Sequence, residues 1–145
     1  MISIYTDASI SKGRCVSTCF VITDKCFLGY NTFMYDNIDT SVRGELLGAI
    51  NAIKYVKGLD IDMAESDCVL YSDSINAINL VRQYRDKNMT KQVRIYYDLL
   101  EELVILLDTC NVTLKHIKGH QLNHNPNKVV DMISNSMLRY ELGKE

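Results

Sequence analysis

The chain opens with MISIYTDAS, residues 1–9, in which β-branched and aromatic residues alternate with polar ones in the manner of a strand. Bulky residues fall on both faces, which is typical of a central strand that is covered on both sides. We expect this strand to run out near Asp7 and to deliver its carboxylate to the rim of the sheet, where sites are often built. The rest of the fold is expected to be organised around it.

A second stretch, CVLYSDS at residues 68–74, repeats the pattern of an apolar run that ends in a hydroxyl residue and an aspartate, Asp73. Either aspartate alone is equally well explained as a cap for the helix or turn that follows. As a pair they direct attention to further acidic residues that the fold brings to the same rim.

The remaining pattern predicts an α/β protein. Residues 1–35 contain three strand-like runs separated by short turns and are expected to form an antiparallel meander. Later segments are predicted to be helices at 41–58, 74–85, 91–110 and 128–142, and strands at 68–74 and 111–117. We therefore predict one domain, residues 1–145, with a five-stranded mixed sheet whose first three strands are antiparallel, flanked by helices.

The longest periodic segment, residues 91–110, is expected to be one continuous core helix. The residues assigned to its apolar stripe are Val93, Tyr96, Tyr97, Leu100, Leu103, Val104 and Leu107.

Composition is ordinary for a soluble globular protein, with 47% hydrophobic and 23% charged residues. Five cysteines without a CxxC pair indicate reduced core thiols in a cytoplasmic protein. No apolar stretch approaches membrane-spanning length, so no membrane role is expected. The net charge of −2 by itself points away from nucleic-acid binding, although it does not locate a positive patch.

Two more acids complete a set of four: Glu45 in the first helix and Asp131 in the first turn of the last helix. Glu45 alone is better explained as a complement to the helix dipole. Converging carboxylates repel one another unless cations neutralise them, and an all-oxygen ligand set suits Mg²⁺ or Mn²⁺. A pair of such ions is suited to in-line displacement at phosphorus, which predicts a phosphodiester substrate.

Four motifs carry these acids in chain order: YTDAS with Asp7, RGELLGAI with Glu45, YSDS with Asp73 and KGHQLNHNPNKVVD with Asp131. Together they resemble ribonuclease H of the type 1 branch, and the resemblance extends over nearly the whole chain. The resemblance implies hydrolysis of the RNA strand of RNA/DNA hybrids with two Mg²⁺ ions, for which Mn²⁺ can substitute, leaving 3′-hydroxyl and 5′-phosphate ends. It further implies that Asp7 bridges the metals, that Asp131 holds the water-activating ion, and that Glu45 and Asp73 hold the other.

The same resemblance implies that His120 assists proton transfer and product release from a mobile loop. His124 lies in the same loop, and the interval to the last acid is longer than usual in the family, so either histidine can be the catalytic one. His116 alternates with apolar residues and is expected to be structural. A metal site made by the three histidines is disfavoured because Gly119 and Pro126 exclude one continuous helix face.

Substrate contacts are expected from Ser9 and from the hydroxyl and guanidinium groups of Thr40, Ser41 and Arg43, which can hold a DNA-strand phosphate. The family usually has Asp-Gly-Ser where this chain has Asp-Ala-Ser, which makes hybrid selectivity less secure than catalysis. The basic, Trp-containing extra helix of some relatives is missing. A modest positive patch, equally readable as a solvated helix end, is formed by Arg82, Arg85, Lys87, Lys91 and Arg94.

Two other functions stay open. One is a different nuclease on the same fold, such as a junction resolvase or a DNA nuclease. The other is a non-catalytic nucleic-acid-binding domain, which the presence of all four acids and His120 disfavours. A fragment of a larger reverse transcriptase is also considered, although Met1 directly before the first strand favours a free-standing protein, expected to be a monomer.

Overall fold

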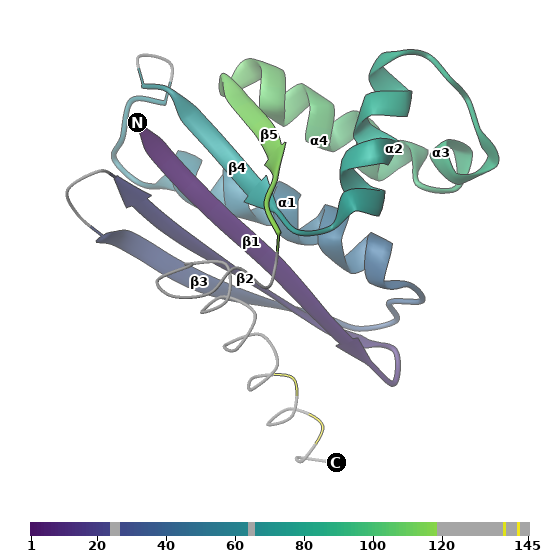
Figure 1. Ribbon diagram of the computed structural model, residues 1–145. Helices are drawn as coiled ribbons and strands as arrows, with labels where there is room; N and C mark the ends of the chain where they lie inside the picture. The colour runs from purple at the N-terminus through teal and green to yellow at the C-terminus, as the bar shows by residue number, and fades with distance from the viewer. Residues whose placement is uncertain (24–26, 64–65, 119–137, 139–141, 143–145) are drawn as a thin grey trace.

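A computed structural model of the protein describes residues 1–23, 27–63, 66–118, 138 and 142. Five strands form one mixed sheet in the order β3-β2-β1-β4-β5 (Figure 1). They are β1 (Ile2–Ser11), β2 (Arg14–Thr23), β3 (Phe27–Tyr35), β4 (Cys68–Ser72) and β5 (Val112–His116). The first three are antiparallel, and β4 and β5 run parallel to β1 and to each other, which confirms the predicted fold class.

The central strand β1 is longer than predicted, so Asp7 does not lie at its end. Pairing with β2 continues through Ser11, which faces Arg14 across the hairpin. Pairing with β4 stops at Thr6, opposite Ser72. The prediction missed this because the hairpin partner extends β1 beyond the point where its parallel neighbour ends.

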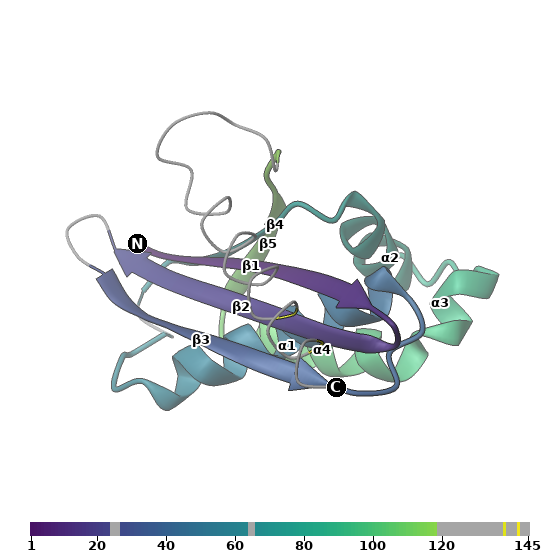
Figure 2. The same cartoon turned by 90° about the horizontal axis from the view of Figure 1, so that it is seen from below.

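The helices are α1 (Ser41–Gly58), α2 (Ile75–Arg85), α3 (Lys91–Ile95) and α4 (Tyr97–Thr109). Helix α1 packs on β1 and β2, and α4 packs on α1 and β5. Both lie on the same side of the sheet, as the view from below shows (Figure 2). Thr40 caps α1 and Ser74 caps α2, each accepting a hydrogen bond from the backbone N–H three residues later.

The single helix predicted for residues 91–110 is broken at Tyr96, which has non-helical dihedrals of φ −105° and ψ 18° and separates α3 from α4. The Tyr96 hydroxyl forms a hydrogen bond with Thr40, at the start of α1. Val93, Leu100, Leu103 and Leu107 are buried as predicted.

Tyr97 departs from the predicted stripe, since it is 39% exposed. The buried residues Val93, Tyr96, Leu100, Leu103 and Leu107 keep a regular 3–4 spacing across the break, and Tyr97 lies at the edge of that stripe.

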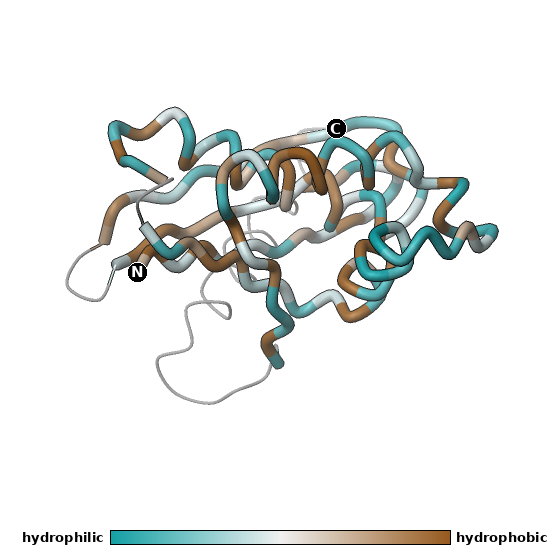
Figure 3. Tube along the Cα trace, turned by 90° about the horizontal axis from the view of Figure 1, so that it is seen from above, coloured by the Kyte–Doolittle hydropathy of each residue, from teal (hydrophilic) through white to brown (hydrophobic). Residues whose placement is uncertain are grey.

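The core lies between the sheet and helices α1, α2 and α4. Figure 3 shows hydrophobic residues in brown along the Cα trace of the strands and helices. Its largest fully buried side chains include Ile4, Leu46, Ile50, Leu70 and Leu103. In the described part of the chain, no helix is both long and apolar enough to cross a membrane.

Four of the five cysteines lie in the described residues, and all four are buried and free, in agreement with the expectation of reduced core thiols. The fifth, Cys26, lies outside the described residues. So does the predicted last helix, apart from Leu138, which is buried, and Leu142.

Candidate active site

Asp7 lies in the central strand at the level where β4 has ended. Its remaining strand partner is Thr18 of β2. Asp7 is only 3% exposed, and the backbone N–H of Ala8 donates to its Oδ1 at 2.9 Å. The carboxylate is therefore fixed beside the end of a neighbouring strand, at the rim that the sequence predicted.

Two glycines allow α1 to lie very close to the sheet. A Cβ atom at Gly44 would lie 2.6 Å from Cys15 Sγ, and one at Gly48 would lie 2.9 Å from Ser17 Cβ. Both distances are well inside ordinary van der Waals contact. Because these positions are one turn apart on α1, their missing side chains set the spacing between the helix and β2.

This close approach brings Glu45, on the first turns of α1, to the carboxylate of Asp7. The Ala8 N–H that donates to Asp7 also donates to Glu45 Oε1 at 3.3 Å. Glu45 is nearly buried. One backbone donor thus holds two carboxylates from elements far apart in the sequence.

Asp73 follows β4 and is positioned by the turn that starts α2. The Ser74 N–H donates to Ser72 Oγ at 3.1 Å, and Ser74 Oγ accepts from the Ala77 N–H at 3.3 Å. The turn is therefore fixed on both sides of Asp73, which is partly exposed.

The structure brings three predicted ligands together, since one carboxylate oxygen from each of Asp7, Glu45 and Asp73 lies within 4.8 Å of the others. The neighbouring Cys15 thiol has its pKa raised to about 12, chiefly by burial and further by the charges of Glu45 and Asp7. Because the three clustered side chains are acidic and their ligand atoms are oxygens, the donor set fits a hard divalent cation such as Mg²⁺ or Mn²⁺.

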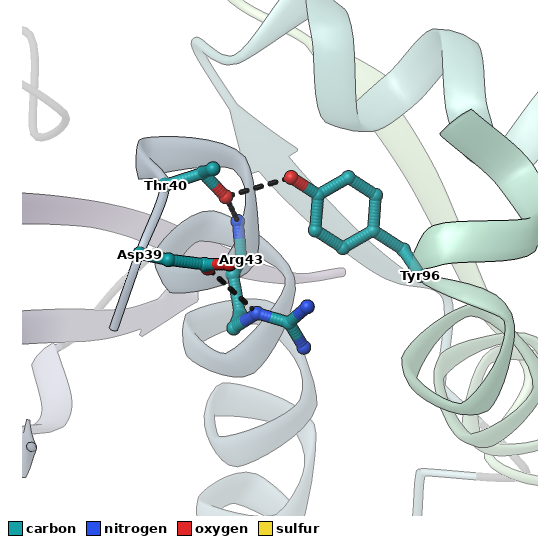
Figure 4. A network of polar contacts seen from close by, with 4 residues as sticks. All are labelled: Asp39, Thr40, Arg43 and Tyr96. Atoms are coloured by element: carbon teal, nitrogen blue, oxygen red, sulfur yellow. Dashed lines mark hydrogen bonds and ion pairs between the residues drawn. The ribbon is translucent and has the colours of Figure 1, made fainter. Parts of the chain in front are cut away.

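A polar network lies at the start of α1 (Figure 4). Thr40 Oγ1 accepts from the Arg43 N–H at 3.2 Å and forms a hydrogen bond of 2.7 Å with the Tyr96 hydroxyl. Arg43 Nε donates to Asp39 Oδ1 at 3.0 Å, and its guanidinium carbon lies 5.1 Å from the centre of the Tyr96 ring. Arg43 lowers the pKa of Asp39 below its usual value, mainly through this hydrogen bond.

Asp39 and Tyr96 were not singled out as binding residues by the sequence. Apolar periodicity correctly placed Tyr96 in the core, where it is 4% exposed, but gave no sign that its hydroxyl meets Thr40. The i, i+4 spacing of Asp39 and Arg43 was the available signal for that ion pair.

Of the other predicted site residues, Ser9 is nearly buried in β1, and Ser41 is the exposed first residue of α1. His120, His124 and Asp131 lie outside the described residues.

The predicted positive patch is partly neutralised. Arg85 pairs with Asp108 through its two terminal guanidinium nitrogens, at 2.9 and 3.3 Å. Arg82 and Arg85 line a cavity of about 490 Å³ between α2, α4 and β5. The cationic surface is therefore smaller than the count of basic residues suggested.

Solved structures of low sequence identity share this fold. LC11-RNase H1, isolated from compost by a metagenomic approach, matches with a TM-score of 0.76 and 16% identity over 97% of each chain. Its complex with an RNA/DNA hybrid matches at 0.72 and 16% identity, over 94% of this chain and 95% of that one. The prototype foamy virus protease-reverse transcriptase matches at 0.70 and 17% identity, over 93% of this chain but 20% of the viral one. At such identities the likeness shows the fold.

No curated protein sequence matches the chain. The family model for RNase H, however, matches residues 1–139, a range that includes all four acids singled out from the sequence. It also spans every strand of the sheet and the three carboxylates that the structure brings together. The chain therefore belongs to the RNase H family of nucleases.

Proposed function

We propose that this protein is a metal-dependent endonuclease that cleaves the RNA strand of RNA/DNA hybrids and leaves 3′-hydroxyl and 5′-phosphate ends. The observation that carries the proposal is the cluster of Asp7, Glu45 and Asp73, whose carboxylate oxygens lie within 4.8 Å of one another. Family membership supports the reaction class, and a related protein, LC11-RNase H1, has been solved in complex with an RNA/DNA hybrid.

The proposed ligands of two Mg²⁺ ions, with Mn²⁺ as a substitute, are the three clustered carboxylates and Asp131, which the sequence supplies. When bound, such ions supply an activated water and stabilise charge on the leaving oxygen. Asp7 is the proposed bridge because it is central in the sheet and held by the Ala8 N–H. Glu45 shares that donor, and their two orientations are therefore linked.

Proton transfer is assigned to His120, with His124, four residues later in the sequence, as the alternative. A positioned histidine contributes typically about 10²–10⁴-fold, whereas the carboxylates hold the whole site. Removing the histidine is therefore expected to slow turnover without abolishing it.

Substrate binding is assigned to the side chains near the start of α1. Thr40 and Arg43 present a hydroxyl and a guanidinium at the same end of α1, which suits a phosphate of the DNA strand. Ser41 begins the same helix, and Ser9 follows the cluster along β1. Contacts of this kind fix register on the duplex without reading its sequence.

The test is a cleavage assay on a hybrid with each strand labelled separately, in Mg²⁺, in Mn²⁺ and in excess chelator, with analysis of the product ends. Asp73→Asn is expected to remove nearly all cleavage. Asp60→Asn, the same chemical change on an exposed acid beyond α1, is the matched control and is expected to cleave like the parent.

A panel of duplex DNA, duplex RNA and a four-way junction separates the alternatives. Cleavage of the junction or of duplex DNA in preference to the hybrid would replace this proposal with a resolvase or a DNA nuclease. Binding without cleavage in every metal would replace it with a non-catalytic nucleic-acid-binding domain. Residues 1–145 are proposed to act as one monomeric domain, which light scattering at assay concentration checks.

A further inference from the structure

Arg43 is already bound to an acid of its own chain. Its Nε donates to Asp39 Oδ1 at 3.0 Å, while the Asp39 side chain is 66% exposed and the Arg43 side chain 29% exposed. The planar guanidinium binds phosphate best with two parallel N–H groups, and one edge of that fork includes Nε. In this structure Asp39 occupies that edge with the same kind of charge that a phosphate would bring.

The Tyr96 ring provides a second contact for the Arg43 guanidinium. Its ring lies 5.1 Å from the guanidinium carbon, within the range of cation–π attraction, so Arg43 is held in place even if Asp39 leaves. Tyr96 is nearly fully buried, between α3 and α4, and therefore provides a fixed surface.

The hydroxyl groups of Thr40 and Tyr96 carry two protons between them, and their mutual hydrogen bond uses one. Thr40 Oγ1 already accepts from the Arg43 N–H, and one of the two hydroxyls donates to the other. Whichever way that bond points, the second hydroxyl proton has no acceptor recorded among the described residues. A phosphate oxygen beside Arg43 is the acceptor that would complete the network.

We propose that Asp39 is a built-in competitor that a substrate phosphate displaces from Arg43, and that Tyr96 is the positioning residue that keeps Arg43 and Thr40 ready for this exchange. The inference rests on the proposed function, because it takes Arg43 as a phosphate ligand. It goes further by naming what limits the affinity of that site and which side chain orders it.

The test measures hybrid binding in Ca²⁺ and steady-state cleavage in Mg²⁺ for Asp39→Asn. Exposed ion pairs contribute little, so the expected tightening is about 2- to 5-fold in Kd and KM. Asp36→Asn is the matched control, because Asp36 is an exposed acid three residues earlier that pairs with Arg14 instead, at 3.5 Å. It removes the same charge from the same region and is expected to change Kd less than Asp39→Asn does.

A double variant separates the contact from the general charge. In an Arg43→Gln background, Asp39→Asn is expected to lose its effect on Kd, because there is no guanidinium left to release. An effect that persists in that background, or one equal to that of Asp36→Asn, would overturn the role of Asp39.

Tyr96→Phe keeps the ring and removes the hydroxyl. Loss of the hydrogen bond between the Tyr96 and Thr40 hydroxyls is expected to raise KM about 3- to 10-fold, with the change falling on KM rather than kcat. Thermal melting checks that the variant is folded. An unchanged KM in a folded variant would overturn the role of the Tyr96 hydroxyl in positioning Thr40.

The two proposals fail in different ways. If the parent binds hybrid and Asp39→Asn tightens binding through Arg43 while no RNA is cleaved, the proposed reaction is wrong and the exchange stands. If RNA is cleaved but both substitutions leave Kd and KM unchanged, the exchange is wrong and the proposed reaction stands.

Discussion

Gly48→Ala is expected to destabilise the fold and to slow cleavage, although alanine is the better helix former. The new Cβ would lie 2.9 Å from Ser17 Cβ and 3.3 Å from Thr6 Oγ1. Carbon atoms prefer a separation of about 3.5–4.0 Å, so α1 must move away from the sheet by roughly 0.6–1.1 Å. Ser17 Cβ is attached directly to the backbone of β2 and cannot rotate out of the way.

Two opposing terms decide the sign of the stability change. Helix propensity favours alanine by about 1 kcal/mol. Overpacking of a close contact costs about 1–3 kcal/mol, so the net expectation is a loss of about 1 kcal/mol, or roughly 2–4 °C in Tm. The displacement also carries Glu45 away from Asp7, and a misplacement of about 1 Å can reduce turnover by about 10²-fold.

Gly58→Ala is the matched control, since it makes the same change at the last residue of α1, where nothing lies within 4 Å of the added atom. It is expected to raise stability by up to about 1 kcal/mol and to leave cleavage unchanged. Urea unfolding is measured for both variants. Hybrid cleavage is measured at a temperature below their thermal unfolding transitions. The packing argument is refuted if Gly48→Ala is as stable as Gly58→Ala and cleaves hybrid at the parental rate.

Three other predictions concern charge and proton transfer. Asp7→Asn is expected to remove nearly all cleavage. It is also expected to raise Tm in chelator by a few degrees, because it relieves carboxylate repulsion. A Tm below that of the parent, measured by calorimetry in chelator, would count against a clustered acid site. His120→Ala is expected to slow cleavage by about 10²–10⁴-fold and His124→Ala to have little effect, and the reverse order in single-turnover assays would transfer the role to His124. Burial raises the pKa of Cys19 from 9.0 to about 12, so the unfolded chain loses this proton first and stability falls as pH rises from about 9 to about 12. At pH 10.5 the ionisation of Cys19 alone lowers the free energy of unfolding by ~2 kcal/mol. Urea unfolding at a series of alkaline pH values checks this, and a Cys19→Ala variant whose free energy of unfolding falls with pH as steeply as that of the parent would contradict it.

The carboxylate cluster was predictable because its members follow local rules. Asp7 and Asp73 each come after a run of strand formers, and Glu45 lies beside an apolar stripe of period 3.6. Parallel pairing of β1 with β4 then brings the two aspartates to one rim, which chain order already implied.

The features that the sequence did not reveal depend on contacts between distant segments. The helix break at Tyr96 accompanies a hydrogen bond to Thr40, which periodicity within one segment cannot register. The length of β1 depends on its hairpin partner rather than on its own residues. The closeness of α1 to β2 depends on Gly44 and Gly48, which read in the sequence only as weak helix formers.

The two-sided pairing of β1 has a consequence for the order of folding. Thr6 pairs with Cys19 across a short hairpin and with Ser72, much further along the chain, across a parallel ladder. Closing the longer loop costs more entropy, so we expect the β1–β3 meander to form first and β4 to dock later. Asp73 arrives with β4, and a folding intermediate that lacks this docking holds Asp7 without its third carboxylate. Cation affinity during refolding would then report the docking of β4 on β1.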